Sequence, residues 1–369
     1  MWRNALDRCV ALQRGAVLPD VITYNVVMRA CSTAAEDGDA CTDGQHQGAE
    51  KWVLGLLLEV RRHGLEPNLI TYNTAITSCE RSGRWRRALA FFWQVRESGL
   101  VPDVITLSAL TSACAKGGGR WRRALDLLLG WARRGVAIEA NTISHNAAIT
   151  ACEKGQQWES GLGILREMHR AGGGTARPDI VSYSAAASAC EKGFCWETAL
   201  LLLGEAWTQG LQTDTVMGNA VVSACEKCGR WRPALWLLLD MRRAGPEPDV
   251  VTCSATVSAC EKASFWSQAL QLLGDMECSR LPPNVVACSA VISACVRGER
   301  WERALALLAD MPRHHLTPNV ITYSAAISAC ERGKHWEGAL QLLAEMQLAG
   351  LEPNAVTYSA AISACEKCR

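Results

Sequence analysis

A short sequence motif occurs ten times along this chain of 369 residues, and each copy opens a unit of about 35 residues. This repetition constrains the fold more strongly than any other feature. One copy reads PNVITYSAAISAC from Pro318, and another reads PDVITYNVVMRAC from Pro19. Counted from the residue after the Asp or Asn of this motif, the units begin at Val21, Leu69, Val104, Thr142, Ile180, Thr215, Val250, Val285, Val320 and Ala355.

The nine complete units span residues 21–354. Six have 35 residues, those at Val104 and Thr142 have 38, and the first has 48 because of a polar insert at about 34–48. The composition of this insert predicts a solvated loop. Residues 1–20 correspond to the second half of an N-terminal repeat and residues 355–369 to the first helix of a truncated repeat, so we expect a fragment of a longer array.

Each unit contains two helical patterns. Apolar residues at unit positions 1, 4, 8 and 11 define one face of a first helix, and an Asp or Asn before position 1 is a typical helix start. After a short turn, the pattern W-x-x-A-L-x-L-L-x-x-M predicts a second helix, which in one unit runs from Trp336 through Leu340 to Met346. A single helical hairpin cannot bury its own apolar face, whereas stacked hairpins can. The sequence therefore predicts an all-α solenoid.

Bulk properties exclude several classes of protein. The net charge of +1 creates no overall field toward nucleic acid or membrane, and no run of 18 apolar residues indicates a membrane span. The N-terminal MWRNALDRCV lacks the features of a targeting peptide.

The cysteines and tryptophans follow the repeat. Neighbouring helices lie about 8–10 Å apart, beyond the reach of about 7 Å for a disulfide, so the position-11 cysteines are expected to be buried apolar residues in a reducing compartment. They are Cys31, Cys79, Cys114, Cys152, Cys190, Cys225, Cys260, Cys295, Cys330 and Cys365. Nine tryptophans share position 17 and are expected to pack between repeats: Trp2, Trp85, Trp121, Trp158, Trp196, Trp231, Trp266, Trp301 and Trp336; Trp52 is out of register.

A second stripe of the first helix does not fit the core. Position 2, which lies about 100–180° from the core positions, is always Ile or Val: Ile22, Ile70, Ile105, Ile143, Val181, Val216, Val251, Val286, Ile321 and Val356. Positions 5, 9 and 13 lie beside it and carry Asn or Ser, mostly Ser or Thr, and a cation. The cations are Arg81, Lys116, Lys154, Lys192, Lys227, Lys262, Arg297, Arg332 and Lys367. Glu occupies position 12 in seven units.

Two interpretations of this stripe remain open. It packs on the next hairpin and is otherwise solvated, or it binds a nucleic acid, since one cation per repeat suits a phosphate backbone and an aliphatic platform suits an unstacked base. The glutamates at position 12 would weaken the attraction of phosphate.

These residues resemble the pentatricopeptide repeat (PPR) family in its P-type array. The 35-residue period, the V-x-T-Y-N/S opening, the cation at position 13, the A-L-x-L-L-x-x-M second helix and the terminal Pro-Asp or Pro-Asn cover essentially the whole chain. The tetratricopeptide repeat, a protein-binding helical scaffold, is the nearest alternative, but its period is 34 and its Trp pattern differs. The resemblance implies a right-handed superhelix that binds single-stranded RNA, one base per repeat, with the N-terminal repeat toward the 5′ end.

In this family, position 5 and the last residue of a repeat read the base together. The resemblance thus implies the reading pairs Asn25 with Asn68, Asn73 with Asp103, Ser108 with Asn141, Asn146 with Asp179, Ser184 with Asp214, Asn219 with Asp249, Ser254 with Asn284, Ser289 with Asn319, and Ser324 with Asn354. By the family's code, the pair Asn and Asp favours U, and the pair Asn and Asn favours C. The pair Ser and Asn favours A, and the pair Ser and Asp favours G. The implied sequence is 5′-CUAUGUAAA-3′.

Signals of catalysis are weaker than the repeat pattern. The HWE at His335 with the CEKC at Cys365 is similar to a zinc deaminase signature, but Glu337 and Cys365 both recur at fixed repeat positions. We therefore expect no enzyme activity, metal or cofactor. The resemblance implies a role in organellar RNA metabolism, in a mitochondrion or plastid: stability, processing, splicing, translation or recruitment of an editing factor. The expected partners are RNA and protein effectors, with no membrane or small-molecule substrate.

Overall fold

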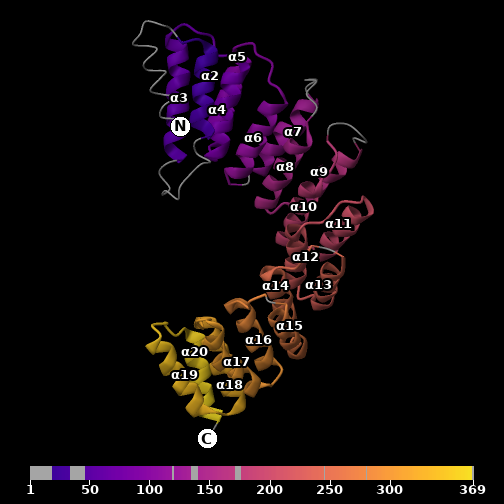
Figure 1. Ribbon diagram of the computed structural model, residues 1–369, viewed down its shortest axis with the longest axis vertical. Helices are drawn as coiled ribbons and strands as arrows, with labels where there is room; N and C mark the ends of the chain where they lie inside the picture. The colour runs from indigo at the N-terminus through magenta and orange to yellow at the C-terminus, as the bar shows by residue number, and fades with distance from the viewer. Residues whose placement is uncertain are drawn as a thin grey trace. The chain divides into compact units, whose positions relative to one another are not determined.

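The computed structural model describes residues 19–33, 46–118, 120–133, 140–170, 176–244, 246–279 and 281–367. In these ranges every regular element is a helix (Figure 1). Trp2, most of the insert, and Cys368 lie outside the described residues.

Helices of two kinds alternate along the chain. The first helices of the hairpins are α2 (Val21–Thr33), α4 (Leu69–Arg81), α6 (Val104–Lys116), α8 (Thr142–Lys154), α10 (Ile180–Lys192), α12 (Thr215–Lys227), α14 (Val250–Lys262), α16 (Val285–Arg297), α18 (Val320–Gly333) and α20 (Ala355–Lys367). The second helices are α3 (His46–Arg62), α5 (Trp85–Glu97), α7 (Trp121–Arg133), α9 (Trp158–Arg170), α11 (Trp196–Thr208), α13 (Trp231–Ala244), α15 (Trp266–Cys278), α17 (Trp301–Asp310) with the short 3₁₀ helix η1 (Met311–His314), and α19 (Trp336–Leu348).

The turn inside each hairpin has a common backbone geometry. The residue at position 15 is left-handed, as at Gly83 with φ of 66° and Phe194 with φ of 57°. This conformation lets an N–H after the first helix return to a carbonyl of its last turn, as Gln157 N does to Cys152 O at 2.9 Å. The turn therefore ends the first helix and starts the second after only a few residues.

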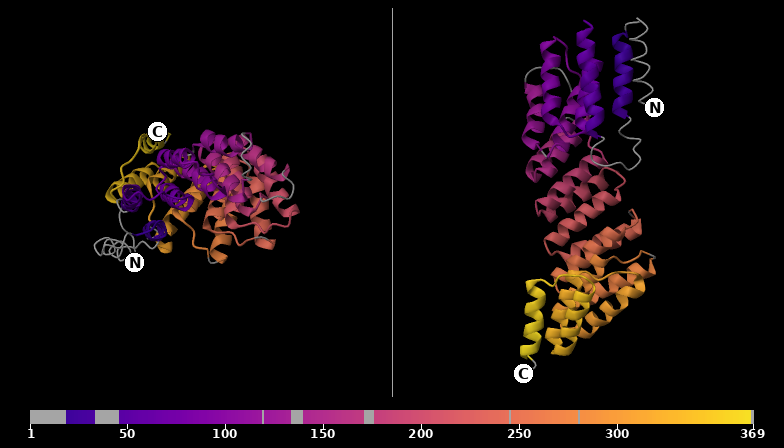
Figure 2. Two further views of the ribbon diagram at one scale, coloured as in Figure 1. Left: turned by 90° about the horizontal axis from the view of Figure 1, so that it is seen from above. Right: turned by 90° about the vertical axis from the view of Figure 1, so that its left-hand side faces the viewer.

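The chain divides into two compact units, Met1–Gly193 and Phe194–Arg369. In the first unit, α4, α6, α8 and α10 pack in succession, and each second helix also contacts the first helix that follows it (Figure 1). The same arrangement runs from α12 to α20 in the second unit (Figure 2). The predicted all-α solenoid is confirmed within each unit, and the handedness of a superhelix stays a prediction.

The core forms where the first helices meet the second helices. Positions 4, 8 and 11 are buried in most repeats, as Tyr183, Val257 and Cys260 show. Nine of the ten position-11 cysteines are buried, Cys365 is exposed, and no disulfide joins the cysteines that the structure describes. Burial raises the pKa of the Cys260 thiol to about 11, which keeps it protonated and apolar at neutral pH.

The recurrent tryptophans from Trp85 to Trp301 are half-buried and pack against the turn of the next repeat, whereas Trp336 is 44% exposed, contrary to the expectation. A Cβ added to Gly298 would lie 2.1 Å from Cδ1 of Trp266, and one added to Gly193 would lie 2.3 Å from Cδ1 of Trp158. Glycine at position 14 therefore makes room for the indole ring of the preceding repeat. Arginines lie over several of these rings, for example Arg300 over Trp266 at 5.1 Å from the ring centroid.

Two further expectations differ from the structure. The Leu in the A-L pair of the second-helix pattern is expected in the core, but Leu340 is 43% exposed, whereas its counterpart Leu305 packs against the cluster of Ile327 and Cys330. The last part of the predicted loop is also helical, because α3 begins at His46.

Candidate nucleic-acid interface

The position-2 side chains form an exposed aliphatic stripe along the first helices. All ten are between 53% and 68% exposed, from Val181 at the low end to Ile22 at the high end. Isolated exposed aliphatic residues are common on protein surfaces, but the same exposure at the same position of every repeat is not. The stripe therefore does not pack on the neighbouring hairpin, which was one of the two interpretations of the sequence.

The last residue of each repeat caps the first helix of the next. In all ten cases its side-chain Oδ1 accepts a hydrogen bond from the backbone N–H of position 3, at 2.8–3.0 Å. An Asp or Asn in this role satisfies one of the free N–H groups at a helix start. The cap fixes the direction of the side chain, with Oδ1 toward the helix.

Five of the nine predicted reading pairs lie within hydrogen-bond distance of each other. The position-5 side chain donates to the last residue of its own repeat at 3.0–3.2 Å in the pairs Asn25–Asn68, Asn73–Asp103, Asn146–Asp179, Asn219–Asp249 and Ser254–Asn284. The two positions are about 30 residues or more apart in sequence and meet only because the repeat folds back on itself.

The other four pairs are arranged differently. Ser108 donates to the carbonyl of Ile105 at 3.0 Å. The Ser289 and Ser324 hydroxyls each form one hydrogen bond of 2.7 Å with the position-3 hydroxyl of the following repeat, on Thr322 and Thr357 respectively. In the remaining pair, Ser184 belongs to the first unit and Asp214 to the second, and each is described within its own unit.

Position 3 of the following repeat is a third member of this network, which the sequence did not reveal. The Thr106 hydroxyl lies 2.6 Å from Oδ1 of Asn73 and 2.8 Å from Oδ1 of Asp103. The Ser182 hydroxyl likewise lies 2.5 Å from Oδ1 of Asn146. The recurrence of Thr or Ser at position 3 was a signal for this contact, but it indicated only a helix start. The network holds two repeats and both members of a reading pair in one geometry.

The outer edge of a capping side chain, meaning the terminal atom that does not cap the helix, differs between Asn and Asp. When Oδ1 is held by the helix, an Asn leaves its Nδ2 group, a donor, and an Asp leaves its Oδ2, an acceptor. Among the described residues, no protein group accepts from Nδ2 of Asn284, Asn319 or Asn354, and none donates to Oδ2 of Asp179. Oδ2 of Asp103 and Oδ2 of Asp249 each accept one hydrogen bond from the position-5 amide, at 3.2 and 3.1 Å, and an oxygen with one such partner can still accept a second. Asn and Asp at the last position therefore differ in hydrogen-bonding character and not in placement.

Two aspartates of this network, Asp103 and Asp249, are held in the ionised form. Burial raises the pKa of the Asp103 carboxyl, but hydrogen bonds from the Thr106 N–H and hydroxyl and from the Asn73 amide outweigh it and lower the pKa below 3.8. The pKa of Asp249 is lowered in the same way by Thr252 and Asn219. Both carboxylates therefore act only as acceptors at neutral pH.

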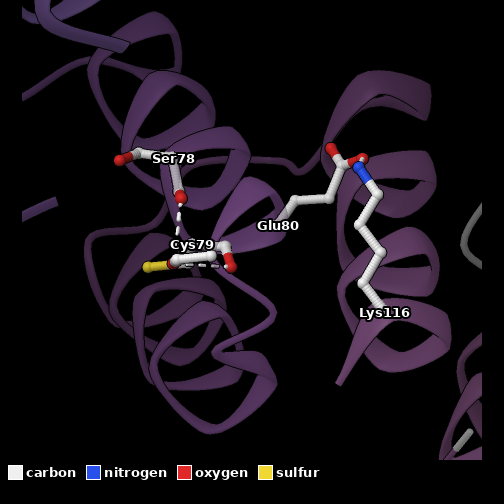
Figure 3. A network of polar contacts seen from close by, with 5 residues as sticks. Ser78, Cys79, Glu80 and Lys116 are labelled. Atoms are coloured by element: carbon white, nitrogen blue, oxygen red, sulfur yellow. Dashed lines mark hydrogen bonds and ion pairs between the residues drawn. The ribbon is translucent and has the colours of Figure 1, made fainter. Parts of the chain in front are cut away.

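Most position-13 cations form ion pairs with the position-12 glutamate of the preceding repeat. Figure 3 shows Glu80 of α4 and Lys116 of α6 pointing toward each other, with Oε1 and Nζ at 2.9 Å. The same pairing joins Lys192 to Glu153, Lys262 to Glu226, Arg297 to Glu261 and Lys367 to Glu331, at 2.6–3.3 Å. Arg81 instead donates to the Ser32 carbonyl oxygen.

Other kinds of site have no support in the described parts of the chain. Those parts contain no group of three or more His, Cys, Asp or Glu side chains that could hold a metal ion. No helix among the described ranges has the length and apolar character needed to cross a membrane.

Repeat profiles identify the family. The PPR repeat family matches residues 59–116, 283–332 and 325–367, the pentatricopeptide repeat domain matches residues 236–299, and the PPR repeat matches residues 143–173 and 219–246. Together these segments cover more than half of the sequence. The chain therefore belongs to the pentatricopeptide repeat family, as the sequence predicted.

Solved structures of this family share the fold. PPR10 in complex with an 18-nt psaJ RNA element has a TM-score of 0.71 and 21% identity, over 99% of this chain and 56% of that one. A triple cysteine-to-serine variant in the same kind of complex gives the same values. A structure of PPR10 from maize has a TM-score of 0.49 and 18% identity, over 100% of this chain and 64% of that one. This chain thus spans 56% of the PPR10 chain in the complexes. A comparison with curated protein sequences finds no significant match.

Proposed function

We propose that this protein binds single-stranded RNA in a sequence-specific manner, one base per repeat. The observation that carries the proposal is the alternation of outer edges along the reading positions, beside an exposed aliphatic stripe. The aliphatic side chains provide a surface on which an unstacked base can lie, and the capped Asn or Asp provides a hydrogen-bonding group at its edge. The RNA-bound PPR10 structures, which share the fold, agree with this proposal.

The outer edge of the last residue of a repeat explains one of the two distinctions in the family's code, namely U and G against C and A. On the Watson–Crick edge, U and G carry a ring N–H donor, whereas C and A carry a ring nitrogen acceptor. An outward Asp oxygen complements U and G, and an outward Asn amide complements C and A. Position 5 then separates pyrimidines from purines by size, since the longer Asn leaves less room than Ser.

The target read in this way is 5′-CUAUGUAAA-3′. Its first letter comes from Asn25 and Asn68, where Oδ1 of Asn25 is buried and has no hydrogen-bond partner among the described residues. In other repeats that atom accepts from the position-3 hydroxyl, as Asn73 does from Thr106. We expect the first base to be recognised less strongly than the others.

Selection of bound RNAs from a random pool tests the proposal directly. A sharper test is the double substitution Ser324→Asn with Asn354→Asp, which keeps the cap on Thr357 and should change the ninth base from A to U. A correct base edge is worth about 1–3 kcal/mol, so the relative affinity for the two RNAs should change about tenfold or more.

The outcome also separates RNA binding from the alternative function. If wild type and double variant bind both RNAs equally while folding normally, position 5 does not read bases. If no RNA is bound at all, the exposed stripe would instead favour a protein-binding scaffold.

We infer that the chain itself is a binding module without catalytic activity and that protein effectors act on the RNA it holds. Organellar transcripts are the proposed targets, on the strength of the family. Expression of a tagged full-length protein and its co-purification with organelles tests the location.

A further inference from the structure

The ion pairs between repeats follow a rule that the sequence alone did not show. A position-13 cation is paired when the preceding repeat has Glu at position 12, and the two residues are 36 to 39 positions apart in sequence. In these pairs the glutamate is the more buried member, for example 20% exposed at Glu261 against 46% at Arg297. The carboxylates thus lie under the cations and hold them along the first helices.

Three of the nine cations follow a repeat without Glu at position 12, namely Arg81, Lys154 and Arg332. Lys154 follows a repeat with Ala115 at position 12, and Arg332 follows a repeat with Val296 there. Lys154 and Arg332 are exposed, and within the described ranges neither has a carboxylate at ion-pair distance. The remaining cations, Arg81 and Lys227, are both engaged in interactions.

A polar pocket of about 490 Å³ lies beside Arg332 in the second unit. Its lining includes the Ser293 and Ser328 side chains and the apolar Val296, and the ion pairs Glu261–Arg297 and Glu331–Lys367 lie around it. The lining therefore carries three cations and two carboxylates, which leaves one positive charge that no carboxylate neutralises.

We propose that Lys154 and Arg332 are the principal phosphate-binding residues of this protein and that the paired cations mainly join the repeats. The pocket beside Arg332 is assigned as a site for one phosphate group of the RNA backbone. This inference rests on the proposed RNA binding and adds to it a prediction of which repeats hold the backbone, namely the fourth and the ninth.

The physical reason lies in the competition between carboxylate and phosphate. A phosphate that approaches a paired cation also approaches the glutamate beneath it, and the repulsion offsets much of the attraction. At Lys154 and Arg332 the approaching phosphate meets a cation without this repulsion and releases condensed counterions from the RNA. In the pocket, the Ser293 hydroxyl offers an additional donor, whereas the Ser328 hydroxyl already donates to the Ser324 carbonyl at 2.9 Å.

The test adds or removes a single glutamate. Val296→Glu places a carboxylate where Glu261 and Glu331 stand in neighbouring repeats, so it should pair with Arg332, while Val296→Gln is the matched uncharged control. Binding is measured from low to high salt with a single-stranded RNA that contains 5′-CUAUGUAAA-3′ within mixed-sequence flanks. The slope of log affinity against log salt should fall by about 0.7 for the Glu variant relative to the Gln variant, which corresponds to about a threefold difference between about 50 and 200 mM salt.

The opposite change should have the opposite effect. Glu261→Gln frees Arg297 from its partner, so the slope should rise by about 0.7 relative to wild type. Thermal unfolding of each variant checks that the fold is retained. If the Val296→Glu variant does not fold, the Glu261→Gln variant still tests the inference.

The two proposals fail in distinguishable ways. If wild type binds the RNA but Val296→Glu, the equivalent Ala115→Glu before Lys154, and Glu261→Gln all leave the slope unchanged, the assignment of Lys154 and Arg332 is overturned while RNA binding stands. If wild type binds no RNA at any salt concentration, both the proposed function and this inference are wrong.

Discussion

Substitutions at Asp179 separate the two roles of the capping residue, because its atoms are divided between them. Its Oδ1 accepts from the Ser182 N–H at 2.9 Å, the Ser182 hydroxyl at 2.9 Å and Nδ2 of Asn146 at 3.0 Å. Asp179→Asn keeps Oδ1 and replaces only the outer oxygen by an amide group. Asp179→Ala removes both. The native Asn25–Asn68 pair, joined at 3.2 Å, shows that two asparagines fit this geometry.

The structure sets the expected magnitudes. The Ala variant loses a helix N-cap, worth about 1 kcal/mol, and the hydrogen bond from Asn146, worth about another 1 kcal/mol. Its unfolding free energy should fall by about 2 kcal/mol, with loss of hydrogen-exchange protection near α8 and α10 and not in distant repeats. The Asn variant retains the cap and should lose less than about 0.5 kcal/mol.

RNA binding should show the complementary pattern. Asp179→Asn turns an outward acceptor into a donor, so the preferred fourth base should change from U to C by about 1–3 kcal/mol. Asp179→Ala should bind both RNAs with little preference. Urea unfolding and a binding assay with two RNAs that differ at this base measure both effects. The reasoning is refuted if the Asn variant is as unstable as the Ala variant, or if it is stable but keeps the preference for U.

Three further predictions concern packing, thiols and pH. Gly298→Ala should destabilise the fold by about 1–3 kcal/mol in urea unfolding, since its methyl group would overlap the indole ring that begins α15, whereas Gly274→Ala, with nothing within 4 Å, should be neutral or stabilising. A thiol reagent at neutral pH, followed by mass spectrometry, should modify the exposed Cys278 before unfolding and the buried Cys260, whose pKa is about 11, only after it. The pKa of Asp103 is lower in the folded state than its unfolded value of 3.8, so its ionised form stabilises the fold above that pH. This contribution is lost as pH falls through the folded pKa. Asp103→Asn should therefore show a smaller acid-induced loss of unfolding free energy than wild type.

The sequence by itself determined the fold class, because the repeat period and the apolar spacing are local properties. A helix has 3.6 residues per turn, so the identities at positions 1, 4, 8 and 11 indicate which face is buried before any tertiary contact is known. The same arithmetic placed position 2 away from the core, but it left open whether the stripe packs on the next hairpin, and the structure shows Ile22 through Val356 exposed. The capping role of Asn and Asp was also predictable, since it acts on the next three residues only.

The contacts between repeats were decided by the tertiary structure. Whether Lys116 is paired depends on Glu80, 36 residues earlier, and on the way one first helix lies against the next. The same stacking brings the Thr106 hydroxyl to within 2.6 Å of Oδ1 of Asn73. Sequence periodicity is a property of one helix at a time, whereas ion pairs and burial depend on the distance between atoms of different hairpins, which only their packing sets.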